Sequence, residues 1–292
     1  MSWHRPVQTL PPLDASKIMC ELLALSTSEP AQLTFSLKTL ASRGSAKGGV
    51  HDGWGVAFYQ GVDVALFREP QAAGDSALVR YLETEGPCTT LGISHIRHAT
   101  HGSVQFVNTQ PFMRELGGQA HVFAHNGTLV DFQTSPSMTL GAYNPVGQTD
   151  SEHAFCALLA RLHTLWVGDS SPPPLEARMA LLVAFAADMR ALGPANFVYS
   201  DGDTLFAHGH RRIHTDGEAA EPPGLWLLER VCMSAEAPPA HQDGVAIEAE
   251  AEEHDALLIA SVALTDEAWR PLAEGELVAV RQGKLLAQHG GV

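Results

Sequence analysis

Cysteine is scarce in this chain of 292 residues. The four cysteines lie far apart and form no C-x-x-C pair: Cys20, Cys88, Cys156 and Cys232. A disulfide framework or a cysteine zinc site needs more cysteines or shorter spacings, so the pattern argues against both. Scattered cysteines are typical of proteins in the reducing cytosol, and we therefore expect a cytoplasmic protein.

Basic residues and long apolar runs are scarce as well. The chain has 18 lysines and arginines against 33 aspartates and glutamates, which gives a formal net charge of −15. Because such a chain repels nucleic acids and anionic membrane surfaces, we expect neither as a partner. No run approaches the roughly 18 apolar residues of a membrane span. The hydrophobic content of 45% is instead spread over short segments and is enough for a substantial core.

The first eighteen residues lack any sign of a fold. They contain Pro6, Pro11 and Pro12, show no apolar periodicity, and have no apolar stretch of the kind found in secretory signals. We expect residues 1–19 to be a disordered extension or a mis-assigned start, and residues 20–292 to form one domain. No break in composition indicates a further domain boundary.

Apolar residues at helical spacing predict four helices. Ser28, Glu29 and Pro30 are typical of a helix start, and leucines follow at positions 33, 37 and 40. Further helices are expected over 75–85, 149–165 and 175–192, and Thr149 and Glu152 have the spacing of a capping box. The helix over 175–192 is apolar around much of its surface, so we expect it to be buried between other elements.

Short apolar segments predict strands on both sides of the two central helices. They cover residues 19–25, 53–59, 62–67, 91–98, 118–125, 197–200, 204–207, 225–228, 257–262, 276–280 and 284–288. Residues 238–254, which contain an acidic run, are expected to form a surface loop. Strands, then two helices, then more strands fit a layered α/β sandwich.

Residues 19–25 form an apolar segment with Cys20 near its start. A free thiol has a pKa of about 8.5, so only a minority is the nucleophilic thiolate at neutral pH. An α-amino group on the same residue, with a pKa of about 8, can take the thiol proton. Translation from Met19, followed by the usual removal of methionine before a small side chain, would leave Cys20 at the N-terminus. For these two residues alone, a buried structural cysteine is the alternative.

Three more clusters carry residues suited to amide chemistry. They are Ser-His-Ile-Arg-His-Ala-Thr-His-Gly at 94–102, Ala-His-Asn-Gly-Thr-Leu at 124–129 and Gly-Gln-Thr-Asp-Ser-Glu at 147–152. Taken singly, Arg97 can be a surface or ion-paired arginine, and Asn126 with Gly127 can be a hairpin turn. Asp150 can simply be an acidic residue in the first turn of a helix. Four clusters in this order, led by Cys20, are far more specific than any one of them.

Together the clusters resemble the class II glutamine amidotransferases, which are N-terminal-nucleophile hydrolases. The motifs M-C-E-L-L, D-G-W-G, H-I-R-x-A, A-H-N-G and T-D-S-E-x-A-F-C are most similar to the stand-alone YafJ-like branch. The resemblance covers Cys20 to Cys156 in its motifs. It implies a four-layer αββα sandwich with largely antiparallel sheets that extends through Gln288, and it implies no cofactor.

The resemblance also implies roles in the hydrolysis of the glutamine side-chain amide. Cys20 would attack the carbonyl, while the Asn126 amide and the Gly127 N–H would stabilise the oxyanion. The guanidinium of Arg97 would bind the substrate α-carboxylate, and Asp150 would bind the α-ammonium.

Other residues of these motifs are expected around the same site. The resemblance places Thr100 and His101 in the substrate pocket, and Arg43 matches an R-G pair that supports the site in relatives. His98 follows the carboxylate-binding arginine where many relatives have an aromatic residue, which leaves that wall of the pocket undefined. The gravest departure is the extension before Cys20, because a peptide bond on its nitrogen would abolish the amine base.

A metal site is the competing interpretation of the histidines. His95, His98 and His101 recur every third residue, and His121 and His125 follow. Residues three apart in a strand point to opposite faces, so His95 and His98 cannot easily share one ion. No cysteine or acidic ligand lies at short spacing beside them, and we expect no metal.

We therefore expect a cysteine-dependent amidase that acts on glutamine or another γ-glutamyl amide through a thioester on Cys20. The single domain uses up the length of the chain, so a synthase that accepts the ammonia would be a separate partner. Three interpretations remain open. The chain can be a glutaminase subunit that feeds such a synthase, a stand-alone γ-glutamyl hydrolase, or a catalytically silent binding protein in which Cys20 stays internal.

Overall fold

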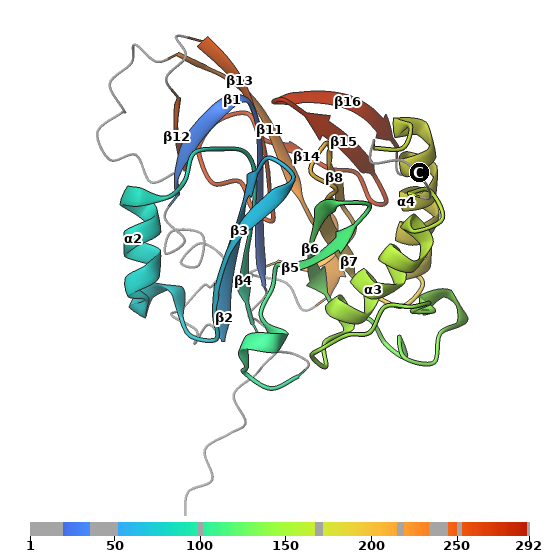
Figure 1. Cartoon of the computed structure of the whole chain (residues 1–292). Coiled ribbons are helices and arrows are strands. Elements are labelled where there is room, and N and C mark those ends of the chain that lie inside the picture. Colours follow the sequence, from blue (N-terminus) through green and yellow to red (C-terminus); the bar gives the residue numbers. More distant parts are fainter. Residues whose placement is uncertain are drawn as a thin grey trace, which may run out of the picture.

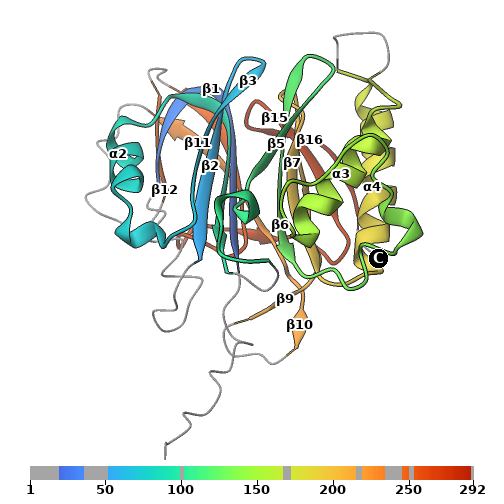
Figure 2. The same cartoon turned by 60° about the horizontal axis from the view of Figure 1, so that its bottom comes forward.

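The computed structural model describes residues 20–35, 52–98, 102–166, 172–214, 219–233, 245–249 and 253–290. In this part of the chain, two large antiparallel sheets pack face to face, and helices lie against their outer faces (Figures 1 and 2). Helix α2 (Ala77–Glu85) covers the first sheet, while α3 (Asp150–Leu162) and α4 (Leu175–Arg190) cover the second. The predicted four-layer αββα sandwich is confirmed.

The first sheet contains the strand that carries Cys20 at its start. Its order is β14 (Arg270–Pro271), β11 (Trp226–Met233), β13 (Glu253–Ala260), β1 (Glu21–Phe35), β4 (Thr89–Arg97), β2 (Gly53–Gln60) and β3 (Asp63–Glu69), and β12 (Val245–Ala249) also pairs with β1. All of its ladders are antiparallel.

The second sheet contains the strand that ends at Asn126 and Gly127. Its order is β16 (Lys284–His289), β15 (Leu277–Arg281), β8 (Leu205–His208), β7 (Ala195–Ser200), β6 (Gln119–Gly127) and β5 (Phe112–Leu116). A separate ribbon pairs β9 (Arg212–Ile213) with β10 (Ala220–Glu221). Short 3₁₀ turns lie at Ala73–Asp75, Phe106–Asn108 and Pro136–Met138.

Alternating residues along the central strands separate three hydrophobic layers. In β1, Leu22 and Ala24 face the second sheet, whereas Leu23 and Leu25 face the helix side of the first sheet. This alternation follows from the two-residue period of a strand whose two faces are both covered. It places a dry layer between the sheets and fixes the direction in which each strand leaves that layer.

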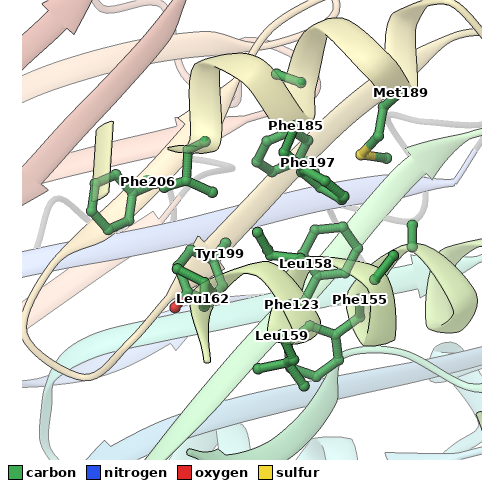
Figure 3. Packing of buried hydrophobic residues seen from close by; sticks show 14 of the residues in the cluster. Phe123, Phe155, Leu158, Leu159, Leu162, Phe185, Met189, Phe197, Tyr199 and Phe206 are labelled. Atoms are coloured by element: carbon green, nitrogen blue, oxygen red, sulfur yellow. The ribbon is translucent and has the colours of Figure 1, made fainter. Parts of the chain in front are cut away.

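Large aromatic residues fill the layer between the second sheet and its helices (Figure 3). The rings of Phe123 on β6 and Phe155 on α3 stack with centroids 5.4 Å apart, and Phe197 on β7 lies beside Phe123 at 5.6 Å. All three side chains are fully buried. Aromatic burial of this size locks α3, and with it Asp150, against the end of β6.

The helix expected from Ser28 onward is wrong over residues 28–35, because β1 continues as a strand to Phe35. Residues 23–27 pair with β13 and residues 31–35 with β12, so both halves of the segment have extended partners. Pro30 lies where the ladder with β4 shifts register, a position at which a missing N–H is tolerated. Residues 36–51, which include the rest of the expected helix, lie outside the described residues.

Two further segments form strands where the sequence predicted none. Residues 245–249, which were expected in a loop, form β12. The last residue of the acidic run, Glu253, is the first residue of β13. Strand β5 was not predicted, although its pairing with β6 is regular from Phe112 to Leu116. A short strand with a mixed pattern of burial leaves little periodicity in the sequence.

The helix that is buried on nearly all sides is α3, whereas the sequence predicted this for α4. Helix α3 is buried around nearly its whole circumference, whereas α4 buries one face and exposes Glu176, Ala180, Ala184 and Ala187. Alanine raises the mean hydropathy of α4 without requiring burial, so the expectation that α4 lies between other elements is wrong. None of the helices in the described ranges is long and apolar enough to cross a membrane.

Candidate active site

Cys20 lies at the start of β1, beside the end of β4. The ladder pairs Glu21 with Ile96, which brings the preceding cysteine next to Arg97 and His98. The His98 N–H donates to Cys20 Sγ at 3.1 Å, and the thiol donates to the His98 carbonyl oxygen at 3.3 Å. The position of the sulfur is therefore set by backbone groups.

The thiol of Cys20 is held in its neutral form. Burial raises its pKa from 9.0 to about 11, and the His98 N–H and Arg97 only partly oppose this rise. Glu21 and Asp150 raise the pKa further by their negative charges. Nucleophilic attack at neutral pH therefore needs a base that takes the thiol proton.

Asn126 and Gly127 form the end of β6, which lies beside Cys20 although it belongs to the other sheet. The Asn126 Nδ2 group donates to the carbonyl oxygen of Cys20, an acceptor that would repel the amide oxygen, so the orientation of the carboxamide is defined. A Cβ at Gly127 would overlap the Pro194 carbonyl oxygen, and only glycine fits there. The alternative interpretation of these two residues, a hairpin turn, does not apply, because both pair with β7 within the sheet.

Arg97 and Asp150 place opposite charges near the thiol. Arg97, at the end of β4, donates through Nη2 to the Gly102 carbonyl oxygen at 3.2 Å. Asp150, the first residue of α3, accepts the Leu129 N–H at 2.8 Å and the Ser151 N–H at 2.9 Å. Both side chains are buried; the charge of Arg97 lowers the pKa of the Cys20 thiol, and the charge of Asp150 raises it slightly.

Only half of the predicted capping box forms at this helix start. The Thr149 side chain accepts the Glu152 N–H at 3.2 Å, as expected. The Glu152 carboxylate does not return to Thr149 but accepts the N–H groups of Val146 at 3.0 Å and Gly147 at 2.6 Å, and pairs with Arg114. Glu152 thus fixes the loop that leads into α3 and to Asp150, the first residue of that helix.

Several predicted residues fall outside the described part of the chain. These are the extension Met1 to Met19, Arg43, Thr100 and His101. His98 lies beside the site, and its Nδ1 is 3.7 Å from the Asp52 carboxylate. Its backbone, rather than its ring, makes the contacts to Cys20.

The histidines considered as metal ligands have other surroundings. His121 contacts the Tyr199 hydroxyl through Nδ1 at 2.7 Å and the Leu116 carbonyl oxygen through Nε2 at 3.1 Å. Burial lowers the pKa of His95 to about 3 and that of His121 to about 4, so both rings are neutral. The ranges that the structure describes contain no group of three or more histidine, cysteine or acidic residues placed to hold a metal ion.

A glutamine side chain that sequence analysis did not single out braces β6 just before Asn126. Gln110 accepts the His125 N–H through Oε1 at 2.7 Å, and its Nε2 donates to the His125 carbonyl oxygen at 3.1 Å. Ser151 joins them, since its hydroxyl lies 3.0 Å from His125 Nδ1. Gln110 belongs to none of the motifs, whereas Ser151 and His125 are each one residue away from a predicted site residue.

A buried ion pair beneath Cys20 was also not predicted. Glu21 contacts Arg212 through two hydrogen bonds, at 2.7 and 3.1 Å, and both side chains are buried. Arg212 also donates to the Ser261 carbonyl oxygen at 2.6 Å. Glu21 is part of the M-C-E-L-L motif, but no spacing in the sequence connects it with residues so far along the chain.

Comparisons with known proteins match most of the chain to one family. Residues 19–290 match the family model of class II glutamine amidotransferases. YafJ of Escherichia coli (strain K12), which carries the description glutamine amidotransferase in its name, is 35% identical over 196 residues, which cover 67% of this chain and 75% of YafJ.

Solved structures extend the likeness over more of the chain. A predicted glutamine amidotransferase from Pseudomonas aeruginosa PA01 is 34% identical with a TM-score of 0.66, over 92% of this chain and 100% of that one. Glutamine phosphoribosylpyrophosphate amidotransferase from B. subtilis shares the fold, with a TM-score of 0.52 at 15% identity over 93% of this chain and 49% of its own. The chain belongs to the class II glutamine amidotransferases, in agreement with the YafJ-like motifs of its sequence.

Proposed function

We propose that this chain hydrolyses the side-chain amide of glutamine, with Cys20 as the nucleophile. The observation that carries the proposal is the meeting of the start of β1 with the ends of β4 and β6. There Cys20 Sγ contacts the His98 backbone, and Asn126 Nδ2 contacts the carbonyl oxygen of Cys20. A nucleophile and an oxyanion donor are thus held together by backbone contacts.

The first step forms a thioester and releases ammonia. The Cys20 sulfur attacks the amide carbon while the thiol proton passes to the α-amino group of the same residue, once that group is free. The amine then gives the proton to the departing nitrogen as the carbon–nitrogen bond breaks. Water attacks the thioester in the second step and releases glutamate and the thiol. The high pKa of Cys20, about 11, supports a mechanism that includes such a base.

The oxyanion that forms in each step needs donors that are already in place. Asn126 Nδ2 carries two hydrogens, of which one is directed to the Cys20 carbonyl oxygen. We assign the other, together with the Gly127 N–H, to the oxyanion. Because Gly127 has no Cβ, the substrate carbonyl can approach the backbone closely.

Arg97 and Asp150 are the charged residues proposed to bind the α-carboxylate and the α-ammonium of the substrate. Arg97 offers a planar fork to the α-carboxylate, and Asp150 offers a negative charge to the α-ammonium. Two backbone N–H groups hold the Asp150 carboxylate, so its charge is fixed before substrate binds. From the resemblance alone we assign Thr100 and His101, which follow Arg97 in the same motif, to substrate binding, and Arg43 to a supporting role.

The direct test is ammonia release from glutamine, measured together with labelling by an electrophilic glutamine analogue. The chain with a free Cys20 amine is expected to release ammonia and to gain one analogue on the peptide that contains Cys20. A γ-glutamyl amide other than glutamine is assayed in parallel, because the same groups would hydrolyse it. Release of no ammonia from either substrate, with no adduct, would support the silent binding protein. A separate synthase that takes up the ammonia remains the proposed partner.

Steady-state kinetics on the same substrate should separate binding from chemistry. The charges at Arg97 and Asp150 serve groups that do not change during the reaction, so Arg97→Ala and Asp150→Asn are expected to raise KM by about 10- to 100-fold, with a smaller loss of kcat. Asparagine is used at 150 because it keeps an acceptor for the Leu129 N–H. Asn126→Ala is expected to lower kcat by roughly 100-fold with little change in KM. A reversed pattern, with KM altered only by Asn126→Ala, contradicts the assigned roles.

A further inference from the structure

Ser261, which directly follows β13, joins the nucleophile strand to the proposed oxyanion donor. Its hydroxyl accepts the Leu22 N–H at 2.9 Å and lies 3.4 Å from Asn126 Nδ2. Its own N–H donates to the Leu22 carbonyl oxygen at 3.0 Å. Ser261 is fully buried, so no water competes for these contacts. One small side chain therefore touches both the strand that begins at Cys20 and the side chain of Asn126.

Glu21 and Arg212 hold Ser261 from the other side. Arg212 donates to the Ser261 carbonyl oxygen and forms the buried pair with Glu21. Burial raises the pKa of Glu21, while Arg212 and a hydrogen bond from the Ser261 hydroxyl oppose that rise. The Leu22 N–H and the Asn126 Nδ2 group can only donate, so the Ser261 hydroxyl accepts from both. Toward Asn126 the hydroxyl therefore acts as an acceptor.

We propose that Ser261 is a positioning residue that orients the Asn126 carboxamide for stabilisation of the oxyanion. The inference rests on the proposed function, because it assigns a support to one of its groups. The terminal torsion of an asparagine side chain is broad, so the amide keeps one orientation better when each hydrogen of Nδ2 has an acceptor. The Cys20 carbonyl oxygen supplies one contact, and the Ser261 hydroxyl supplies the other.

The length of the second contact suits this role. At 3.4 Å it is longer than the usual 2.9–3.0 Å of an N–H···O hydrogen bond, so the donor is directed without being tightly held. Both Nδ2 hydrogens are fixed in the plane of the amide, so an oxyanion forming nearby would share the second hydrogen with the Ser261 hydroxyl in a three-centre hydrogen bond, without rotation of the carboxamide. The stabilisation by the oriented Asn126 amide then occurs only in the transition state, so the loss of Ser261 is expected to lower kcat.

Ser261→Ala, made in the chain with a free Cys20 amine, tests the proposal. It is expected to lower kcat for glutamine by about tenfold and to change KM by less than about twofold. Ser261→Thr, which keeps the hydroxyl, is expected to recover most of the loss. Ser26→Ala is the matched control, because Ser26 is also a buried serine, lies on β1 and accepts the Gly283 N–H at 3.1 Å. It lies six residues from Cys20, roughly 20 Å along an extended strand.

A double-mutant cycle separates positioning from general destabilisation. If Ser261 acts through Asn126, the tenfold loss is expected to disappear when Ser261→Ala is made in Asn126→Ala. A loss that persists in that background, a loss equal to that of Ser26→Ala, or a change mainly in KM overturns the proposal. Should Ser261→Ala not fold, Ser261→Cys takes its place, since its thiol is only a weak acceptor; wild-type kcat in that variant also overturns it. If the unaltered chain releases no ammonia, the proposed function itself has failed, which is a different result.

Discussion

Replacing Cys20 by alanine is expected to reduce ammonia release from glutamine by at least about 10,000-fold and to abolish the covalent adduct with an electrophilic glutamine analogue. Loss of a nucleophile removes the covalent route itself, whereas binding groups and oxyanion donors leave only a small residual rate. Ammonia release and intact-mass analysis of the treated protein measure the two effects. Substantial turnover by Cys20→Ala would show that the amide is hydrolysed in another way.

Cys88→Ala is the matched control for this substitution. Cys88 is also a free cysteine, but it is exposed and lies outside every motif of the site. We expect this variant to keep the rate and the adduct of the unaltered chain. An adduct lost from Cys88→Ala would place the reactive thiol at the surface and contradict the assignment of Cys20.

A second large effect is expected from the residues before Cys20. A chain that begins at Cys20 has a free α-amino group, whereas the chain that retains residues 1–19 has a peptide nitrogen there and no amine base. General acid–base catalysis typically contributes about 100- to 10,000-fold, so the longer form is expected to lose activity by that factor. The mass of the protein from its native locus would show which form exists, and kinetics on the two purified forms would measure the difference.

The pH dependence of alkylation reports on the same group. In the longer form the pKa of the Cys20 thiol is raised to about 11, so the thiolate is a minor species below that pH. Alkylation of Cys20 should therefore increase steadily from pH 7 to pH 10 without a plateau. Exposed Cys88 in the same molecule is the internal reference. If the longer form were fully active and its Cys20 reacted as fast as Cys88 at pH 7, the proposed need for the amine would be wrong.

The residues of the proposed site could be named from the sequence because they belong to short motifs. Cys20, Arg97, Asn126 and Asp150 were recognisable together, from four motifs in a fixed order, and the structure brings all four to one end of the sandwich. A motif is local in the chain, so its residues can be identified before the fold is known. The same limit explains why Ser261 escaped notice.

Secondary structure was predictable where a segment's own pattern agreed with its surroundings. The strand expected over 53–59 is β2, and the helix expected from residue 175 is α4, which begins at Leu175. Residues 28–35 were misjudged because the start signal and leucine spacing of a helix are local properties. Their extended form depends on hydrogen bonds to β4, β12 and β13, which no local pattern records.

By itself, the sequence determined the class of fold, the family and the identity of the proposed nucleophile, because these depend on periodicity and on short motifs. The tertiary structure decided the environment of each group. It buried Cys20 and raised its pKa, turned the Asn126 amide to the Cys20 carbonyl oxygen, and joined Glu21 to Arg212 and Ser261. Desolvation and hydrogen-bond geometry arise only when distant segments pack together, so they are properties of the folded chain and not of any stretch of its sequence.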